Sequence, residues 1–251
     1  MVRGTYIAGT GMMLQRRRME TVTNNISNAD TTGYKKEYLV SHSFDEVMIR
    51  RMGDSADNGR MPAVGPLNLG TQVDQLYVNY EGGSFEETAR SSDFALAGDV
   101  FFVVQTSAGE RYTKSGAFYA DSAGFLVDGE GNYLLGENGP LYVGGTEFGV
   151  DRNGGVMLDG QYTDRIRVAS FADNNALRKQ GSNLYFSLEG PQAETKPFEV
   201  IQGYLETSNV DIGREMVDMM TVFRTYETNQ RMLSMIDETV GKAVNEIGRL
   251  R

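Results

Sequence analysis

Residues 8–37 read "AGTGMMLQRRRMETVTNNISNADTTGYKKE", and this stretch sets the fold prediction. Apolar or small residues recur in it in alternating steps of four and three, with Gln15 as the polar exception. This is the spacing of a helix that packs along one seam. The seam residues are Ala8, Met12, Gln15, Met19, Val22, Ile26 and Ala29. Such a helix would be roughly 38 Å long, and because its glycines weaken it in isolation, we expect it to need a partner helix.

The C-terminal segment carries a matching pattern and is the expected partner. Its apolar stripe is wider than a two-stranded coil buries, and Ser208 or Asn209 before it would serve as an N-cap. We predict an antiparallel pair with Gln15 opposite Gln230. The C-terminal seam residues are Ile212, Met216, Met219, Phe223, Tyr226, Gln230, Leu233, Asp237, Val240, Val244 and Ile247.

The region between the two helices is of a different kind. Short apolar runs there alternate with Ser-Ala-Gly, Asp-Gly and Asn-Gly turns, which predicts antiparallel strands. The polar, glycine-rich "MGDSADNGRMPAVGPLNLG" before it is typical of an extended connector. The predicted fold class is α+β, with long N- and C-terminal helices in an antiparallel coiled-coil-like pair and a central antiparallel β-domain. The predicted segments are an N-terminal helix over 1–33, a connector over 34–80, the β-domain over 81–200 and a C-terminal helix over 201–251.

Composition and charge exclude several classes of function. The chain has 251 residues and a net charge of −10, concentrated in the central region, and this acidity would repel nucleic acid phosphates. Without cysteine and with a single histidine, thiolate and histidine-rich metal sites are excluded. We see neither a secretory signal peptide nor an apolar run long enough to span a membrane.

Catalytic and ligand sites are also poorly supported. The loop from Asp128 has the first residues of a calcium loop, but Tyr133 and Gly139 stand where glycine and glutamate are required. We interpret it as a hairpin turn. His42 has no accompanying nucleophile motif, and no phosphate-binding glycine pattern occurs. We therefore expect no enzyme activity, cofactor, metal or small-molecule substrate, although spacing alone leaves a paired-acid glycosidase site open.

Three asparagines, Asn24, Asn25 and Asn28, occupy helix positions that Ala, Glu or Lys would fill more favourably. One explanation is that these amides fix register where the helix packs among copies of itself, because a charge there would be costly to desolvate. The other is that residues 28–33 form a helix C-cap with Gly33 in the left-handed conformation. Both explanations stand at this point.

Three blocks of the sequence resemble bacterial flagellar axial proteins. Residues 1–37 contain Asn-Asn-x-x-Asn before Thr-Thr-Gly-Tyr-Lys, which is similar to the N-terminal signature of that family. The block "DFALAGDVFFVVQTSAGERYTKSGAFYADSAGFLV" resembles the rod and hook β-domain motif. The block "GYLETSNVDIGREMVDMMTVFRTYETNQRMLSMID" resembles the C-terminal helix block. The family more often has glycine at the position of Val100, and proximal and distal rod subunits are not distinguished.

The resemblance implies a structural subunit of the flagellar basal-body rod. Such a subunit would be exported by the flagellar type III apparatus without a cleaved signal and would polymerise helically into the torque-transmitting shaft, which is also the export channel. Its partners would be copies of itself, other rod and hook axial proteins, and the export apparatus. The alternative is a secreted carbohydrate-active or adhesive β-domain on a helical stalk. The expected polymer-interface residues are Ala8, Met12, Gln15, Met19, Val22, Asn24, Asn25, Ile26, Asn28, Gly33, Ile212, Met216, Met219, Phe223, Tyr226, Gln230 and Leu233.

Overall fold

The computed structural model describes residues 2–50, 63–145, 148–181, 183–187, 190–191 and 196–247. The chain forms two compact units, each built from segments that are distant in sequence. We call residues 1–26, 37–77 and 212–251 the helical unit, and residues 27–36 and 78–211 the β unit. The predicted α+β class is confirmed, with two long terminal helices in contact and antiparallel sheets between them in the sequence.

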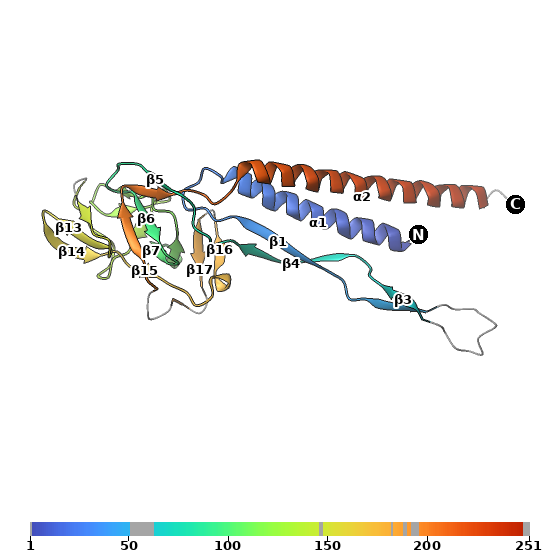
Figure 1. Ribbon diagram of the computed structural model, residues 1–251, viewed down its shortest axis with the longest axis horizontal. Coiled ribbons are helices and arrows are strands. Elements are labelled where there is room, and N and C mark those ends of the chain that lie inside the picture. Colours follow the sequence, from blue (N-terminus) through green and yellow to red (C-terminus); the bar gives the residue numbers. More distant parts are fainter. Residues whose placement is uncertain are drawn as a thin grey trace. The chain divides into compact units, whose positions relative to one another are not determined.

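The two helices are α1 (Val2–Ser27) and α2 (Ile212–Ile247). They run side by side in opposite directions (Figure 1). Contact between them is close, because a Cβ atom at Gly4 would lie 3.0 Å from Cδ1 of Ile236. The expected antiparallel pair is therefore confirmed. Neither helix, within the residues the structure describes, is long and apolar enough to cross a membrane.

The register of this pair differs from the prediction. With Gln15 opposite Gln230, Gly11 would face Ser234. In the structure a Cβ atom at Gly11 would instead lie 3.0 Å from Nδ2 of Asn229. The physical reason is size, because a glycine leaves room for the amide of Asn229, and pairing polar Gln15 with Gln230 offered no comparable fit.

The predicted seam of α2 is only half right. Met219, Tyr226 and Leu233 are partly buried, as expected, but the second inward row is formed by other residues. The residues of that row are Glu215, Val222, Asn229 and Ile236. The predicted row of Ile212, Met216, Phe223 and Gln230 is exposed. The assignment from apolar spacing was wrong because two of the inward positions, Glu215 and Asn229, are polar and contact α1.

A β-ribbon built from two successive two-stranded sheets completes the helical unit. It lies within the segment predicted as a connector and consists of β1 (Glu37–Ser43), β2 (Val47–Arg50), β3 (Ala63–Leu67) and β4 (Thr71–Val78), with β1 paired to β4 and β2 to β3. The part of the ribbon formed by β1 and β4 packs along α1 (Figure 1), where Nη2 of Arg18 donates to Oγ of Ser41 at 3.1 Å and the rings of Tyr6 and Phe44, just after β1, are 6.4 Å apart.

The β unit contains one large sheet and several small ones. The large sheet has the order β16-β17-β8-β7-β11-β10-β9, with β15 also pairing with β7. Its strands are β7 (Phe101–Thr106), β8 (Gly109–Thr113), β9 (Tyr119–Ala120), β10 (Leu126–Val127), β11 (Tyr133–Leu134), β15 (Val168–Ala169), β16 (Arg178–Gln180) and β17 (Leu184–Phe186). The others are β5 (Phe85–Glu87), β6 (Phe94–Ala97), β12 (Gly149–Val150), β13 (Gly155–Leu158), β14 (Gln161–Arg165), β18 (Glu199–Gln202) and β19 (Tyr204–Glu206).

Strand β7 divides the core of this unit in two. Phe102 and Val104 point into one buried cluster, where the rings of Phe102 and Phe118 meet edge to face at 5.4 Å. Phe101 and Val103 point into the other, beside Tyr185. Alternation along one buried strand therefore supplies both clusters.

Three turns of this unit share one design, and the loop from Asp128 is one of them. The Oδ1 atom of Asp128 accepts hydrogen bonds from the backbone N–H groups of Glu130 and Asn132, both at 2.9 Å. Asp121 and Asp151 make the same two bonds in their own turns. The carboxylate of Asp128 thus stabilises a turn, as predicted.

Candidate assembly surface

Asn25, at the end of α1, joins three elements of the helical unit. Its side chain is 1% exposed. Its Oδ1 accepts from the backbone N–H of Glu37 at 3.0 Å, and its Nδ2 donates to the carbonyl of Glu37 at 2.8 Å. The same Nδ2 donates to Oε2 of Glu215 on α2 at 3.1 Å. The amide therefore pairs with the start of β1 as a peptide group would, while it holds α2.

These bonds correct the explanation expected for the asparagines. The register that Asn25 fixes is that of α1 with β1 and α2 of the same chain. Asn24 is exposed, and its amide is 3.4 Å from Oε2 of Glu37. Asn28 lies beyond the helix, where its Oδ1 accepts from the hydroxyl of Thr31 at 3.2 Å. The three amides therefore have separate roles.

Gly33 is left-handed, as predicted, with φ of +67°. It lies beyond the end of α1, however, and its N–H donates to the carbonyl of Glu206 at 2.7 Å, so it does not cap the helix. A Cβ atom at this position would lie 2.5 Å from the backbone of Lys114 and Ser115. Glycine is required here both by the positive φ and by this close approach.

A buried ion pair holds the segment that follows Gly33 in place within the β unit. Nζ of Lys35 lies 2.6 Å from Oε1 of Glu206 and donates to the carbonyl of Glu81 at 2.8 Å, and both charged side chains are buried. Asn209, which was a candidate helix cap, has its Oδ1 bound to the N–H of Lys36 at 2.7 Å. Segments from the beginning and the end of the chain are therefore locked together.

The pKa values of two further groups in the β unit are shifted, one by burial and the other by hydrogen bonds. Desolvation lowers the pKa of Lys114 to about 8, against the opposing effect of Glu206. Its Nζ donates to the carbonyl of Gly98 at 2.7 Å. Burial by itself would raise the pKa of Asp99, but hydrogen bonds from Lys196 and Asn174 lower it below its usual value. Among the described residues, no cluster of three or more acidic or histidine side chains could hold a metal ion.

The helical unit exposes a row of large apolar side chains on α2, which we call the α2 stripe. Its members are spaced to share one side of the helix and are 40–54% exposed. They are Ile212, Met216, Met220 and Phe223. Val217 beside them is also exposed. Among the described side chains of α2, only the polar Glu215 is buried, and eight large apolar side chains of this helix are exposed.

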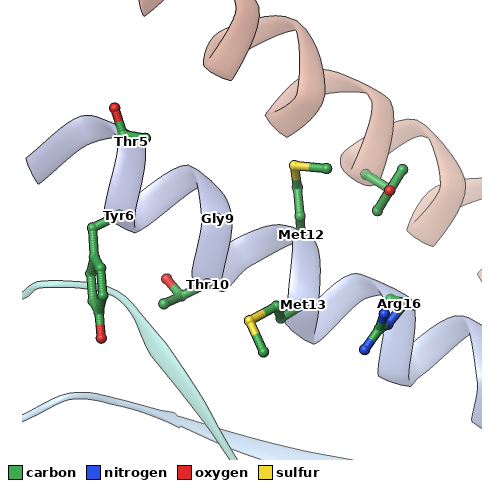
Figure 2. Close-up of a pocket in the computed structure, with 8 residues that line it drawn as sticks. Thr5, Tyr6, Gly9, Thr10, Met12, Met13 and Arg16 are labelled. Carbon is green, nitrogen blue, oxygen red and sulfur yellow. The ribbon is translucent and has the colours of Figure 1, made fainter. Parts of the chain in front are cut away.

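An apolar groove of about 690 Å³ lies on α1, and we call it the α1 groove. Figure 2 shows Gly9 at its centre, with Tyr6, Thr10 and Met13 on one side and Met12 on the side of α2. Its lining residues are Thr5, Tyr6, Gly9, Thr10, Met12, Met13, Arg16 and Tyr226. No atom lies within 4 Å of where a Cβ of Gly9 would be, so the helix backbone itself is accessible here.

The structure sorts the predicted interface residues into three groups. Those already buried within the chain are Ala8, Gln15, Asn25 and Gly33. Those partly buried are Met12, Met19, Val22, Ile26, Asn28, Met219, Tyr226 and Leu233. Those exposed are Asn24, Ile212, Met216, Phe223 and Gln230. The exposed residues and the lining of the α1 groove are the parts of this set that another chain could contact.

Sequence reasoning missed three positions that organise this region. Leu14 is buried although it lies outside the predicted seam of α1. Glu206 and Glu215 are buried acids that the pattern of apolar residues could not reveal. For Glu206 the one signal in the sequence is that it is the single charge in the stretch 203–210, whereas Glu215 stands among other charged residues and carries no such signal.

Three family models match successive parts of the chain. The flagella basal body rod protein model matches residues 6–35, the flagellar hook protein FlgE/F/G D1 domain matches 95–181, and the flagellar basal body rod FlgEFG protein C-terminal model matches 201–246. The flagellar hook-basal body complex protein FlhO of Bacillus subtilis is 30% identical over 270 residues, with 100% of both chains covered. The chain belongs to the flagellar rod and hook FlgE/F/G family.

Other relatives agree with this assignment. The flagellar basal-body rod protein FlgG of Buchnera aphidicola subsp. Acyrthosiphon pisum is 30% identical, covering 96% of this chain and 98% of its own. FlgF of Caulobacter vibrioides is 29% identical, with 98% of each chain covered. The resemblance drawn from sequence is thus confirmed, and the family is structural and non-enzymatic. The matched ranges of this rod and hook family protein contain most of α1, the strands β7 and β8, and most of α2.

Proposed function

We propose that this axial protein is a subunit of the flagellar basal-body rod, which polymerises helically with its own copies and with neighbouring rod and hook proteins. The assembled shaft would transmit motor torque, and its lumen would serve as the export channel. We further propose that the subunit leaves the cell through the flagellar type III apparatus without a cleaved signal. The curated relatives named as basal-body rod proteins, FlgG and FlgF, support a rod role over a hook role.

The observation that carries this proposal is the exposed α2 stripe. Fully burying an exposed Met or Phe side chain contributes about 1.5–3 kcal/mol, and burying the exposed half of each stripe side chain would contribute about half as much. A large apolar patch on a single chain is the usual mark of a protein–protein contact. Repeated along a polymer, contacts of this size on several sides of each subunit give a stiff shaft. The carbohydrate-active alternative gains no support from a structural family.

The proposal is tested by genetic complementation. A deletion strain should lose swimming and regain it with the wild-type gene. A Met216→Glu/Phe223→Glu variant should fail to restore swimming, because two carboxylates would then need to be desolvated in the polymer. A matched Thr221→Glu/Thr228→Glu variant, with both changes at exposed positions of α2 outside the stripe, should restore it. Normal swimming of the deletion strain would contradict the proposal.

A further inference from the structure

The α1 groove and the α2 stripe match in length. The groove extends over residues 5–16 and the stripe over residues 212–223. Each covers twelve residues of helix, or roughly 17 Å at the usual rise. A helix carrying the stripe could therefore fill the groove from end to end.

The two surfaces also match in shape. The open backbone at Gly9 lets a second helix approach closely, as small residues do at helix crossings. The stripe offers Met216 and Met220, whose unbranched side chains fill irregular gaps, followed by Phe223. Met12 and Met13 give the groove the same adaptability. Ridges spaced four residues apart on one helix pack into such a groove on another.

Charge favours the same pairing. Residues 2–19 contain four arginines and no acidic residue. Residues 211–223 contain three acidic residues and one basic residue, of which Asp211 and Asp218 are exposed. The groove and the stripe therefore lie on segments of opposite net charge, which attracts them and disfavours groove–groove contacts.

The stripe of the same chain cannot reach its own groove. Because Gly11 lies opposite Asn229 in the antiparallel pair, the centre of the groove is level with α2 residues near 230. The centre of the stripe, near Asp218, is about twelve residues away, which is roughly 18 Å along the axis. The occupant of the groove must come from another molecule.

We propose that the α1 groove of one copy accepts the α2 stripe of the next copy. The contact joins two different surfaces, so each copy retains a free groove at one level and a free stripe at another. Contacts of this heterologous kind add subunits without closing. The inference rests on the proposed function and deepens it, because it assigns which helix surfaces meet between neighbouring subunits.

The natural absence of cysteine makes this pairing directly testable in the full-length chain. Met13→Cys places a thiol in the groove and Met220→Cys places one on the stripe. Met235→Cys is a matched control, because Met235 is also an exposed α2 methionine, 61% against 54% exposed for Met220, but lies outside the stripe. Chains with single substitutions are purified, mixed in pairs, concentrated and mildly oxidised, and disulfides are read on non-reducing gels and by mass spectrometry.

We expect the yield of the 13–220 disulfide to exceed the yields of the 13–235, 13–13 and 220–220 disulfides by about tenfold or more. Only two thiols that the contact between copies holds close together have a high effective concentration. A single chain carrying both Met13→Cys and Met220→Cys should give a ladder of covalent oligomers. Dominant 13–13 or 220–220 products, an equal yield with Met235→Cys, or a ladder that stops at the dimer would overturn the pairing.

These outcomes separate the two proposals. If the deletion strain is immotile and the wild-type chain polymerises, but no 13–220 disulfide forms, the groove–stripe pairing is wrong and the rod proposal stands. If the deletion strain swims normally, the rod proposal is wrong whatever the gels show.

Discussion

The β unit and the helix α2 treat their apolar side chains in opposite ways. In the β unit, Phe94, Phe101, Phe102 and Phe118 are fully buried in two clusters that flank one strand. On α2, eight large apolar side chains, mostly methionine and valine, are 40–66% exposed, and among the side chains of α2 that the structure describes only Glu215 is buried. The β unit therefore completes its apolar core within a single chain, whereas α2 buries its side chains only on the side that faces α1.

The geometry of the two architectures explains this difference. Strands of a twisted sheet can be covered on both faces by other parts of the same chain, because short turns return the chain repeatedly. Two helices in contact bury only one narrow side of each. A helix with apolar side chains on more than that one side leaves some of them in water until further helices pack against it. The predictions below test this contrast.

The largest effect should follow from cutting into the core of the β unit. Phe102→Ala removes a fully buried ring that meets Phe118 at 5.4 Å, and we expect the free energy of unfolding to fall by about 3–5 kcal/mol. Phe223→Ala, at a ring 49% exposed on α2, should change it by less than about 0.5 kcal/mol in the monomer. Urea unfolding followed by tyrosine fluorescence measures both. Equal losses would show that α2 is as completely packed as the sheet.

A smaller effect should come from the charge that the β unit buries. The pKa of Lys114 is about 8 in the folded protein, below its ordinary value, so the folded chain releases this proton first. Between pH 8 and the ordinary lysine pKa the unfolded chain then binds more protons, and the free energy of unfolding rises with pH. Over this pH range the free energy of unfolding increases by at most about 3 kcal/mol.

Lys114→Met should remove this rise. Urea unfolding of the wild type and the variant is compared at intervals from pH 7 to pH 9, where ordinary tyrosines remain mostly protonated. The difference in stability between the two proteins should change in favour of the wild type as the pH increases. Parallel curves would show that the ammonium group of Lys114 is solvated in the folded protein.

The smallest effect concerns the buried amide of Asn25 inside the helical unit. Asn25→Ala leaves the backbone of Glu37 and the carboxylate of Glu215 without the amide, and should cost about 2 kcal/mol. The loss should appear in helical circular dichroism at 222 nm before the tyrosine signal of the β unit changes. Asn24→Ala, at the exposed neighbouring position, is the matched control and should cost less than about 0.5 kcal/mol. Equal losses of stability in Asn25→Ala and Asn24→Ala would show that the hydrogen bonds of Asn25 do not stabilise the helical unit.

Much of the fold could be read from local patterns. Steps of four and three predicted both helices because a helical period is a property of neighbouring residues. Turn residues such as Asp128 predicted hairpins because their side chains bond their own backbone. The flagellar family could be recognised from the blocks at 1–37, 93–127 and 203–237, since motifs survive in sequence whatever their tertiary partners.

Long-range pairing was beyond those patterns. The ribbon β1–β4 was predicted only as an extended connector, because the glycine-rich residues 52–70 dominated that assignment, although β1, β2 and β4 contain no glycine. The inward row of α2 was misassigned because Glu215 and Asn229 looked like solvent positions. Each is compensated by one residue on α1, Asn25 and Gly11, and such compensation is invisible until the register is known.

By itself, the sequence determined the two terminal helices, their antiparallel pairing, the central β-domain and the family, because periodicity, turn chemistry and motifs are local. Only the tertiary structure decided which side of α2 faces α1, that Asn25 and Lys35 bind within their own chain, and which apolar surface is left for a neighbour. Burial and register depend on contacts between residues far apart in the chain, and no local pattern encodes which of several similar faces is covered.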